Sequence, residues 1–443
     1  MNTRATFATA LLALGSLAAP AQTLNTAKLD SLLTALGTHD KLMGSLALSH
    51  DGKVVYSRAF GYAQLAPKVP ATPATRYRIG SITKMFTGVL IFQLIEEKKL
   101  ALGTKLATFF PQVPNARDIT IDQLLSHRSG IHNFTDDPAY VGYMTQPKTS
   151  AELLAIIAQP QPDFAPGAKY EYSNSNFVLL TYIVEKLTRM PYAQALQKRV
   201  FTKAGLKNTC YGGKIDPKKQ EAFSYETSGG GWKLSPETDM SIPAGAGALV
   251  STPTDLDRFL EALFGGKLLS ASSLAAMQDV RDGYGRAMLQ APFGEKKGYG
   301  HTGGIDAFRS VALYFPGDKL AVALCGNGGS FSPNEALVGA LSIYFGKPYK
   351  IPNFAASAYA PTPADLDRYA GTYGSPAIPL KITVTKEGAS LRAQARGQGA
   401  FALEPVSAGV FKFDQAGIRM EFDAAKPTFT LQQGGKEYSF TKE

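Results

Sequence analysis

The chain has 443 residues and a formal charge of +10, from 46 lysines and arginines against 36 aspartates and glutamates. Its basic residues are scattered and are not interleaved with aromatic residues in runs, which argues against nucleic acid as a partner. The length predicts two or more domains that each bury a core. Two cysteines, Cys210 and Cys325, are too few for a disulfide framework.

The first segment, residues 1–21, has the pattern of a secretory signal peptide. Arg4 precedes an apolar run over residues 7–18, and Ala19-Pro20-Ala21 forms an A-x-A cleavage site. No stretch reaches the roughly 20 apolar residues that a membrane helix needs. We therefore expect an exported protein, periplasmic or secreted, that does not span a membrane. Export permits one disulfide between the two cysteines, although the second ends an apolar run and is expected to be a buried thiol.

The first elements in chain order are a helix near residues 27–36 and a β-hairpin that turns at Asp51 and Gly52. A helix over residues 81–98 follows, with Ser81 and Lys84 in its first turn. Positions i and i+3 share a helix face, with Cβ atoms about 5–6 Å apart. The lysine amine can therefore reach the serine hydroxyl, as a base reaches a nucleophile.

This S-x-x-K spacing is not specific by itself. It occurs again at Ser439 and Lys442, where no helix follows. A serine at a helix start can also act only as a cap for an unpaired backbone N–H.

The middle of the chain is predicted to be mostly helical. Helices are predicted over residues 120–125, 150–157, 177–188, 192–200 and 254–263. Tyr172 and Asn174 lie two apart in a polar segment before one of these helices, so in an extended segment both side chains point the same way. His127 and His132 flank a Ser-Gly loop that they are expected to order.

A glycine-rich stretch later in the chain contains His301, Thr302 and Gly303 at the expected start of a strand, where glycines allow a close approach of backbone to ligand. Residues 298–303 match G-x-G-x-x-G. A dinucleotide site needs a helix directly after this motif. The following residues alternate like a strand, so nucleotide binding is rejected.

Strands return in a second hairpin over residues 308–327. Strands from both ends of residues 22–350 predict one antiparallel sheet flanked by helices, with an all-α region inserted: an α/β (α+β) sandwich. Residues 351–365 read as an Ala- and Pro-rich linker. Residues 366–443 alternate apolar and polar residues between glycine turns, which predicts a small antiparallel β-barrel or sandwich that we interpret as an accessory domain.

With S-x-x-K, Y-x-N and H-T-G in this order, the chain resembles the serine β-lactamase and penicillin-binding protein family. The branch is that of class C β-lactamases, D-alanyl-D-alanine carboxypeptidases, D-aminopeptidases and related esterases. The resemblance runs from about residue 41 to residue 344 and includes LLSHRSGI at residues 124–131 and the segment at residues 244–263. It implies a β-lactamase-like sandwich, in agreement with the predicted elements.

The resemblance implies that Ser81 is the acylated nucleophile and that Lys84 and Tyr172 shuttle its proton. A serine hydroxyl is a weak nucleophile until a neighbour takes its proton, so we expect one of these two partners to have a lowered pKa. Burial, mutual proximity and a protonated His301 could each contribute. The sequence leaves open which of the two is the general base.

The remaining implied roles concern substrate binding. Asn174 would bind the substrate amide, His301 would stand where many relatives have lysine, and Thr302, followed by Gly303, would help to hold a substrate carboxylate. The backbone N–H groups of the nucleophile and of Gly304 would form the oxyanion hole. These residues need no cofactor or metal, and none is expected.

The predicted function is that of a serine hydrolase acting on amide or ester bonds of small molecules or peptides. The favoured substrates are D-alanyl-D-alanine or related D-amino-acid peptides, with esterase activity. A class C-like β-lactamase and a dedicated esterase are alternatives. A non-catalytic protein that binds penicillin or peptidoglycan is a second alternative, which the intact serine, lysine and tyrosine set disfavours.

Overall fold

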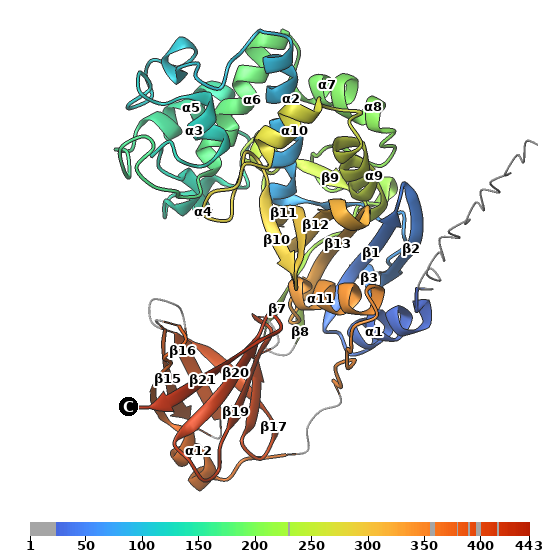
Figure 1. The fold of residues 1–443 in the computed structure, drawn as a ribbon, viewed down its shortest axis with the longest axis vertical. Helices are drawn as coiled ribbons and strands as arrows, with labels where there is room; N and C mark the ends of the chain where they lie inside the picture. The colour runs from blue at the N-terminus through green and yellow to red at the C-terminus, as the bar shows by residue number, and fades with distance from the viewer. Residues whose placement is uncertain are drawn as a thin grey trace, which may run out of the picture.

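The computed structural model describes residues 24–228, 231–354, 359–378, 380–388, 390–395, 400–413 and 416–443. The expected signal peptide, residues 1–21, lies outside the described residues. The chain forms a sheet covered by helices, and a β-barrel that ends the chain (Figure 1). Both features agree with the predicted fold class, and the structure resolves the choice between barrel and sandwich in favour of the barrel.

The main sheet has eight strands, and the six on its main path come from both ends of the first region. Its path runs through β10 (Leu289–Phe293), β11 (Lys296–Ile305), β12 (Phe308–Phe315), β13 (Leu320–Gly329), β1 (Leu42–His50) and β2 (Lys53–Phe60). Beside it, β7 (Tyr225–Ser228) pairs with β13 and with β8 (Gly231–Leu234). Pairing of β1 with β13 joins segments far apart in sequence. The helical region is thereby enclosed between the two sets of strands, as predicted.

The two faces of this sheet are covered by different helices. Val311 and Leu313 of β12 pack in the cluster formed with α1 (Thr26–Thr38) and α11 (Pro333–Tyr344). Ala312, between them, belongs to the cluster on the other face, with α9 (Pro253–Phe264) and α2 (Thr83–Glu96). The alternation follows from the two-residue period of a strand.

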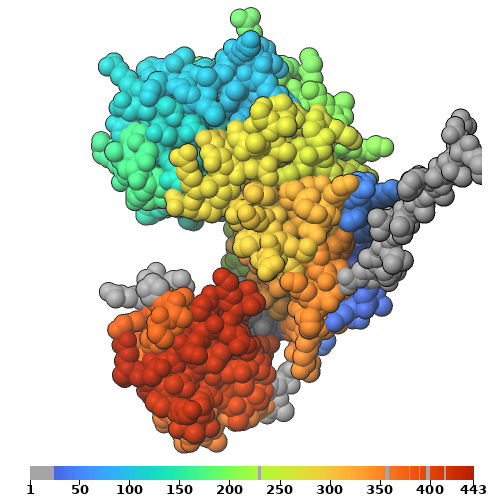
Figure 2. All heavy atoms as spheres, in the orientation of Figure 1, coloured from blue at the N-terminus to red at the C-terminus, as the bar shows by residue number. Residues whose placement is uncertain are grey.

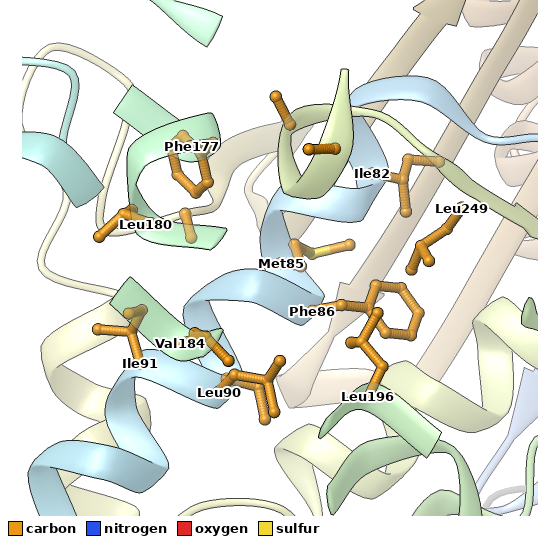
Figure 3. Packing of buried hydrophobic residues seen from close by; sticks show 14 of the residues in the cluster. Ile82, Met85, Phe86, Leu90, Ile91, Phe177, Leu180, Val184, Leu196 and Leu249 are labelled. Carbon is orange, nitrogen blue, oxygen red and sulfur yellow. The ribbon is translucent and has the colours of Figure 1, made fainter. Parts of the chain in front are cut away.

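The helical region packs around α2. Its further helices are α3 (Ile121–Leu125), α4 (Tyr140–Tyr143), α5 (Ser150–Ala158), α6 (Asn174–Thr188), α7 (Tyr192–Leu196), α8 (Thr202–Ala204) and α10 (Ala271–Met277). Every side chain of α2 from Thr83 to Leu94 is buried, as expected for a helix that is apolar on nearly all sides. Figure 3 shows Val184 of α6 beside Leu90 of α2. The polar groups on α2 between Thr83 and Leu94 are thus removed from water.

Three local predictions differ from the structure. Ser81 lies in a 3-10 turn, Gly80–Ile82, ahead of α2. Helix α6 begins at Asn174, three residues earlier than expected. The predicted helix at residues 192–200 is α7 followed by a wider π turn, Gln197–Phe201. Both cysteines are free thiols, and Cys325 is buried as predicted.

The barrel closes through eight antiparallel strands. They are β14 (Gly371–Gly374), β15 (Lys381–Glu387), β16 (Ser390–Ala395), β17 (Phe401–Ser407), β18 (Val410–Phe413), β19 (Ile418–Phe422), β20 (Thr428–Gln433) and β21 (Lys436–Lys442). Pairing of β14 with β21 closes the ring, which removes the edges that an open sheet would expose. Ser439 and Lys442 lie in β21, so this second S-x-x-K is on a strand.

The barrel forms a separate lobe below the sheet in Figure 2. It touches α11, where the backbone N–H of Gly434 donates to Glu335 Oε1 at 3.2 Å. No helix within the described residues is long and apolar enough to cross a bilayer.

Candidate active site

The turn that carries Ser81 packs against the free edge of β11. Strand β10 pairs with β11 only as far as Gly300, so the following residues leave an edge open. A Cβ on Gly303 would lie 1.9 Å from the carbonyl oxygen of Ile79. A Cβ on Gly80, where φ is +52°, would lie 2.7 Å from the amide nitrogen of Gly304. Only glycine allows this approach, which brings the backbone of Gly304 next to the serine turn.

Lys84 points from α2 to three oxygen atoms. Its Nζ lies 3.0 Å from Ser81 Oγ, 2.7 Å from Asn174 Oδ1 and 2.8 Å from the carbonyl oxygen of Ala246. Burial holds the pKa of the Lys84 amine well below its usual range. A neutral amine has two N–H bonds for the two acceptors that cannot donate, the amide and carbonyl oxygens. Its lone pair is then free to accept the serine proton.

Tyr172 reaches the same serine from the other side. Its hydroxyl lies 2.8 Å from Ser81 Oγ. Burial raises the pKa of Tyr172 above its usual range, so the side chain is a phenol at neutral pH and donates to the serine oxygen. Of the two partners of Ser81, Lys84 is therefore the one with the lowered pKa that the sequence analysis expected. At Tyr172 burial outweighs any effect of neighbouring charges, so the lowered pKa is not found there.

His301 was predicted to lie at the start of a strand. It lies instead well inside β11. It is 3% exposed, and its Nε2 lies 3.0 Å from the hydroxyl of Tyr284. Burial lowers the pKa of His301 to about 3. His301 is thus not the protonated neighbour that was considered as one possible cause: the ring is neutral at physiological pH. Thr302 is exposed and Gly303 is buried.

His127 lies against Tyr172, with 4.2 Å between the ring centroids. Its Nδ1 accepts the backbone N–H of Ser173 at 3.1 Å, which holds the segment between Tyr172 and Asn174. His132, in contrast, sits near the surface with Nδ1 2.9 Å from Asp163.

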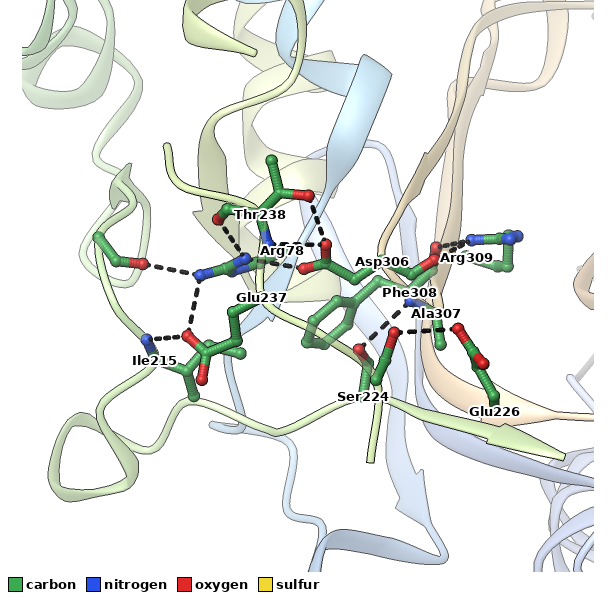
Figure 4. Close-up of polar contacts among 12 residues, drawn as sticks. Arg78, Ile215, Ser224, Glu226, Glu237, Thr238, Asp306, Ala307, Phe308 and Arg309 are labelled. Atoms are coloured by element: carbon green, nitrogen blue, oxygen red, sulfur yellow. Dashed lines mark hydrogen bonds and ion pairs between the residues drawn. The ribbon is translucent and has the colours of Figure 1, made fainter. Parts of the chain in front are cut away.

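A buried ion-pair network fixes the end of β11 relative to the serine turn (Figure 4). Arg78 lies three residues before Ser81, and its Nη1 is 2.7 Å from Asp306 Oδ2. Thr238 donates to the other oxygen of this carboxylate from its backbone N–H at 3.0 Å and its hydroxyl at 2.7 Å. Asp306 follows β11 directly, so the network holds Gly304 against the serine.

Sequence reasoning missed three contributors to this site. Ala246 was within a segment recognised as typical of the family, but its carbonyl role needs the fold. Arg78 carries no motif, although its place three residues before Ser81 was a signal. Tyr284 has no sequence signal at all, because its contact with His301 depends on the loop between α10 and β10.

A cleft of about 580 Å³ opens beside the serine. Ser81, Asn174 and Gly304 line it, and so do three charged residues, Glu226, Asp306 and Arg309. Within the described residues, no three His, Cys, Asp or Glu side chains come together as a metal site would require. A serine hydroxyl between a buried neutral amine and a phenol has the geometry of nucleophilic catalysis, which defines a serine hydrolase site.

Comparison with known proteins agrees with this class. The sequence model of the Beta-lactamase family matches residues 29–341, and the chain belongs to this family of serine hydrolases. It is 27% identical to penicillin-binding protein 4* of Bacillus subtilis (strain 168), over 92% of this chain and 97% of that protein. It is 26% identical to the teichoic acid D-alanine hydrolase of Staphylococcus aureus, over 51% of this chain and 55% of that protein.

Two solved structures extend the comparison. The D-amino acid amidase from Ochrobactrum anthropi SV3, complexed with L-phenylalanine amide, is 26% identical, with a TM-score of 0.63 over 72% of this chain and 98% of the amidase. The octameric penicillin-binding protein homologue from Pyrococcus abyssi is 23% identical, with a TM-score of 0.68 over 94% of this chain and 100% of that chain. The second likeness shows a shared fold.

Proposed function

We propose that the protein is an exported hydrolase that forms an acyl-enzyme on Ser81 with acyl derivatives of D-amino acids and cleaves their amide and ester bonds. The observation that carries the proposal is the contact of Ser81 Oγ with Lys84 Nζ at 3.0 Å and with the Tyr172 hydroxyl at 2.8 Å. The D-configuration is supported by the relatives, which include a D-amino acid amidase and a teichoic acid D-alanine hydrolase.

In the acylation step the neutral amine of Lys84 accepts the Ser81 proton while Oγ attacks the substrate carbonyl carbon. The backbone N–H groups of Ser81 and Gly304 stabilise the negative oxygen, at about 3–4 kcal/mol per donor. The C–N or C–O bond then breaks, and the proton passes from Lys84 to the leaving group by way of the Tyr172 hydroxyl. Water hydrolyses the acyl-enzyme by the same route in reverse.

Asn174 binds the acyl part of the substrate in this proposal. Its Oδ1 accepts from Lys84 at 2.7 Å, and its Nδ2 donates one N–H to Thr135 at 3.1 Å. The second N–H of Nδ2 is available for a substrate amide oxygen. Because the cleft begins at these residues, the acyl group lies toward Asn174 and Gly304.

Labelling of the nucleophile tests the proposal. A fluorescent penicillin or an acyl phosphonate should add one label, on the peptide that carries Ser81. Ser81→Ala should abolish the label. Ser439→Ala is a matched control, because it removes the serine of the second S-x-x-K, on β21, and should label as the wild type does. A label that persists in Ser81→Ala would place the nucleophile elsewhere.

Export is tested separately. It rests on the charged, apolar and A-x-A pattern of residues 1–21. Expression in a Gram-negative host should yield periplasmic protein with an amino terminus at Gln22. Deletion of residues 1–21 should leave the protein in the cytoplasm. An unprocessed amino terminus in the periplasmic fraction would contradict the cleavage site.

A further inference from the structure

The protonation state of His301 follows from its two hydrogen bonds. Nδ1 contacts the carbonyl oxygen of Thr302, which can only accept, so Nδ1 carries the proton. Nε2 is therefore an acceptor, and the hydroxyl of Tyr284 donates to it across 3.0 Å. Both ring nitrogens of His301 therefore make hydrogen bonds to other protein atoms. A neutral imidazole in this state offers the substrate neither a free N–H nor a positive charge.

His301 lies on the side of the serine where the leaving group departs. The leaving group takes its proton from the Tyr172 hydroxyl in the proposed mechanism, so it must lie next to Tyr172. The rings of Tyr172, Tyr284 and His301 form one wall there, with centroids 6.4 Å apart for Tyr172 and His301 and 5.6 Å apart for Tyr284 and His301. A charge on His301 would act directly on the leaving group.

The arginines near this wall are already paired. Arg128 Nη2 lies 2.6 Å from Asp282. Arg286 contacts Asp122 through Nε and Asp279 through Nη1 at 3.1 Å. The exposed hydroxyl of Thr302 is the neutral donor that remains on this side. A carboxylate on the leaving group would meet no unpaired cation among these described residues.

We propose that the hydrogen bond from Tyr284 to His301 keeps the leaving-group side of the cleft uncharged and makes the enzyme prefer leaving groups without a carboxylate. The substrate class is then amides and esters of acyl D-amino acids with a neutral leaving group, ahead of peptides that release a free D-amino acid. This inference rests on the proposed function and narrows its substrates. Tyr284 acts here as a positioning residue for His301.

The test compares two peptides that differ in one charge. N-acetyl-D-alanyl-D-alanine and its C-terminal amide share the same scissile bond, and release of D-alanine or D-alaninamide is measured by chromatography. The wild type should cleave the amide with a kcat/KM about tenfold higher, since the free acid must place a carboxylate where no cation pairs with it. The matching D-lactate depsipeptide and its methyl ester provide a faster pair with the same contrast.

His301→Lys supplies the missing charge. In this variant the preference should move toward the free acid by about tenfold or more. The intrinsic reactivity of the two leaving groups is the same for every variant, so a change in the ratio reports the site. Labelling of Ser81 by the acyl phosphonate shows that the variant is folded.

Tyr284→Phe removes only the donor to Nε2, and its effect should depend on pH. Loss of a hydrogen bond to the neutral ring raises the pKa of His301, so the variant gains positive charge as the pH falls. The groups that face the ring are Lys84, His127, Tyr172 and Tyr284, of which Lys84 and His127 have lowered pKa values. Relative turnover of the free acid should rise about threefold from pH 8 to pH 5.5.

In the wild type the same ratio should stay flat over this range, because the pKa of His301 lies at about 3. Tyr344→Phe is the matched control, since it removes a tyrosine hydroxyl that lies 2.7 Å from Nδ1 of a remote histidine, His50. It should keep the wild-type ratio and its flat profile.

Three results would overturn the inference: a wild-type enzyme that prefers the free acid, a ratio unchanged in His301→Lys, or a flat profile in Tyr284→Phe. If the proposed function itself is wrong, the experiments give a different result. In that case Ser81 takes no label, and neither the peptides nor the depsipeptides are cleaved.

Discussion

The two regions of the molecule bury different kinds of side chain. In the described part of the barrel the buried residues are apolar or tyrosine, with Phe411, Phe429 and Phe440 at its centre. The hydrolase region also buries lysine, histidine and aspartate side chains. Those that are at most 3% exposed include Lys84, His127, Asp257 and His301. Burying such groups costs stability, so the comparison separates a region packed for stability from one that accepts this cost for chemistry.

The same physical effect has opposite uses in the two regions. Removal from water around Phe411 stabilises the barrel through the hydrophobic effect. Removal from water around Lys84 destabilises its charged form, which leaves a neutral amine beside Ser81. Packing of α2 on all sides therefore sets the protonation state of Lys84, whereas the core around Phe411 contains no lysine, histidine or carboxylate.

The largest expected effect is on catalysis. Lys84→Ala and Tyr172→Phe should each lower the acylation rate by about 10²–10⁴-fold, because each removes a partner of the serine proton. The double variant should be little slower than either single variant if the two act as one proton-transfer unit. Stopped-flow acylation with a chromogenic ester measures this. Losses that multiply would show that the two side chains act independently.

The next effect contrasts two core phenylalanines. Phe411→Ala and Phe86→Ala each remove a fully buried ring and should each destabilise by about 3–5 kcal/mol, measured by chemical denaturation. Only Phe86→Ala should also lower kcat/KM, because Phe86 lies on α2, stacked on Phe259 with 3.7 Å between the ring centroids. Equal losses of kcat/KM in both variants would mean that the barrel takes part in the chemistry.

The barrel shows what a sequence pattern can and cannot predict. Strand alternation and glycine turns are local, and they predicted the antiparallel strands correctly. Closure depends on pairing β14 with β21 across the whole domain, as between Tyr373 and Lys442. No local pattern encodes that pairing, so the sequence could not distinguish a barrel from a sandwich.

The active site also has features that the sequence predicts and features that it does not. The approach of Lys84 to Ser81 follows from their spacing on adjoining helical turns, and was predicted. The choice between Lys84 and Tyr172 as the group with the lowered pKa depends on burial, which only the packed core reveals. The role of Tyr284 could not be predicted, because its hydrogen bond to His301 joins a loop to the interior of a strand.

Asp257 should give a smaller effect, on stability alone. It is fully buried on α9, and neither carboxylate oxygen has a hydrogen-bond partner. Burial raises its pKa well above the usual range. The folded protein therefore keeps this proton while the unfolded chain releases it above pH about 4, so wild-type stability falls as the pH rises. Asp257→Asn cannot ionise and should gain about 1–3 kcal/mol at pH 8.

Asp255, two residues earlier on the same helix, is the matched control. It is also buried, but it accepts from Asn208 at 2.6 Å, Thr209 at 3.0 Å and Arg258 at 3.0 Å. Asp255→Asn should therefore lose stability, where Asp257→Asn gains it. Urea denaturation at pH 5 and pH 8 measures both, and a gain from Asp257→Asn that does not grow with pH would contradict the assignment.

The smallest expected effect lies at the contact between the two regions. Glu335 on α11 accepts the backbone N–H of Gly434 at 3.2 Å, and burial raises the pKa of its carboxyl. Glu335→Ala removes the acceptor and leaves that N–H without its partner, at a cost of about 1 kcal/mol. Glu335→Gln keeps an acceptor and cannot ionise. It should match or slightly exceed wild-type stability at pH 7, since a carboxyl with a raised pKa weakens the fold as the pH rises.

Calorimetry should show the barrel transition moving to a lower temperature in Glu335→Ala, with kcat/KM for a chromogenic ester unchanged. A loss of kcat/KM in this variant would mean that the packed barrel supports the chemistry after all.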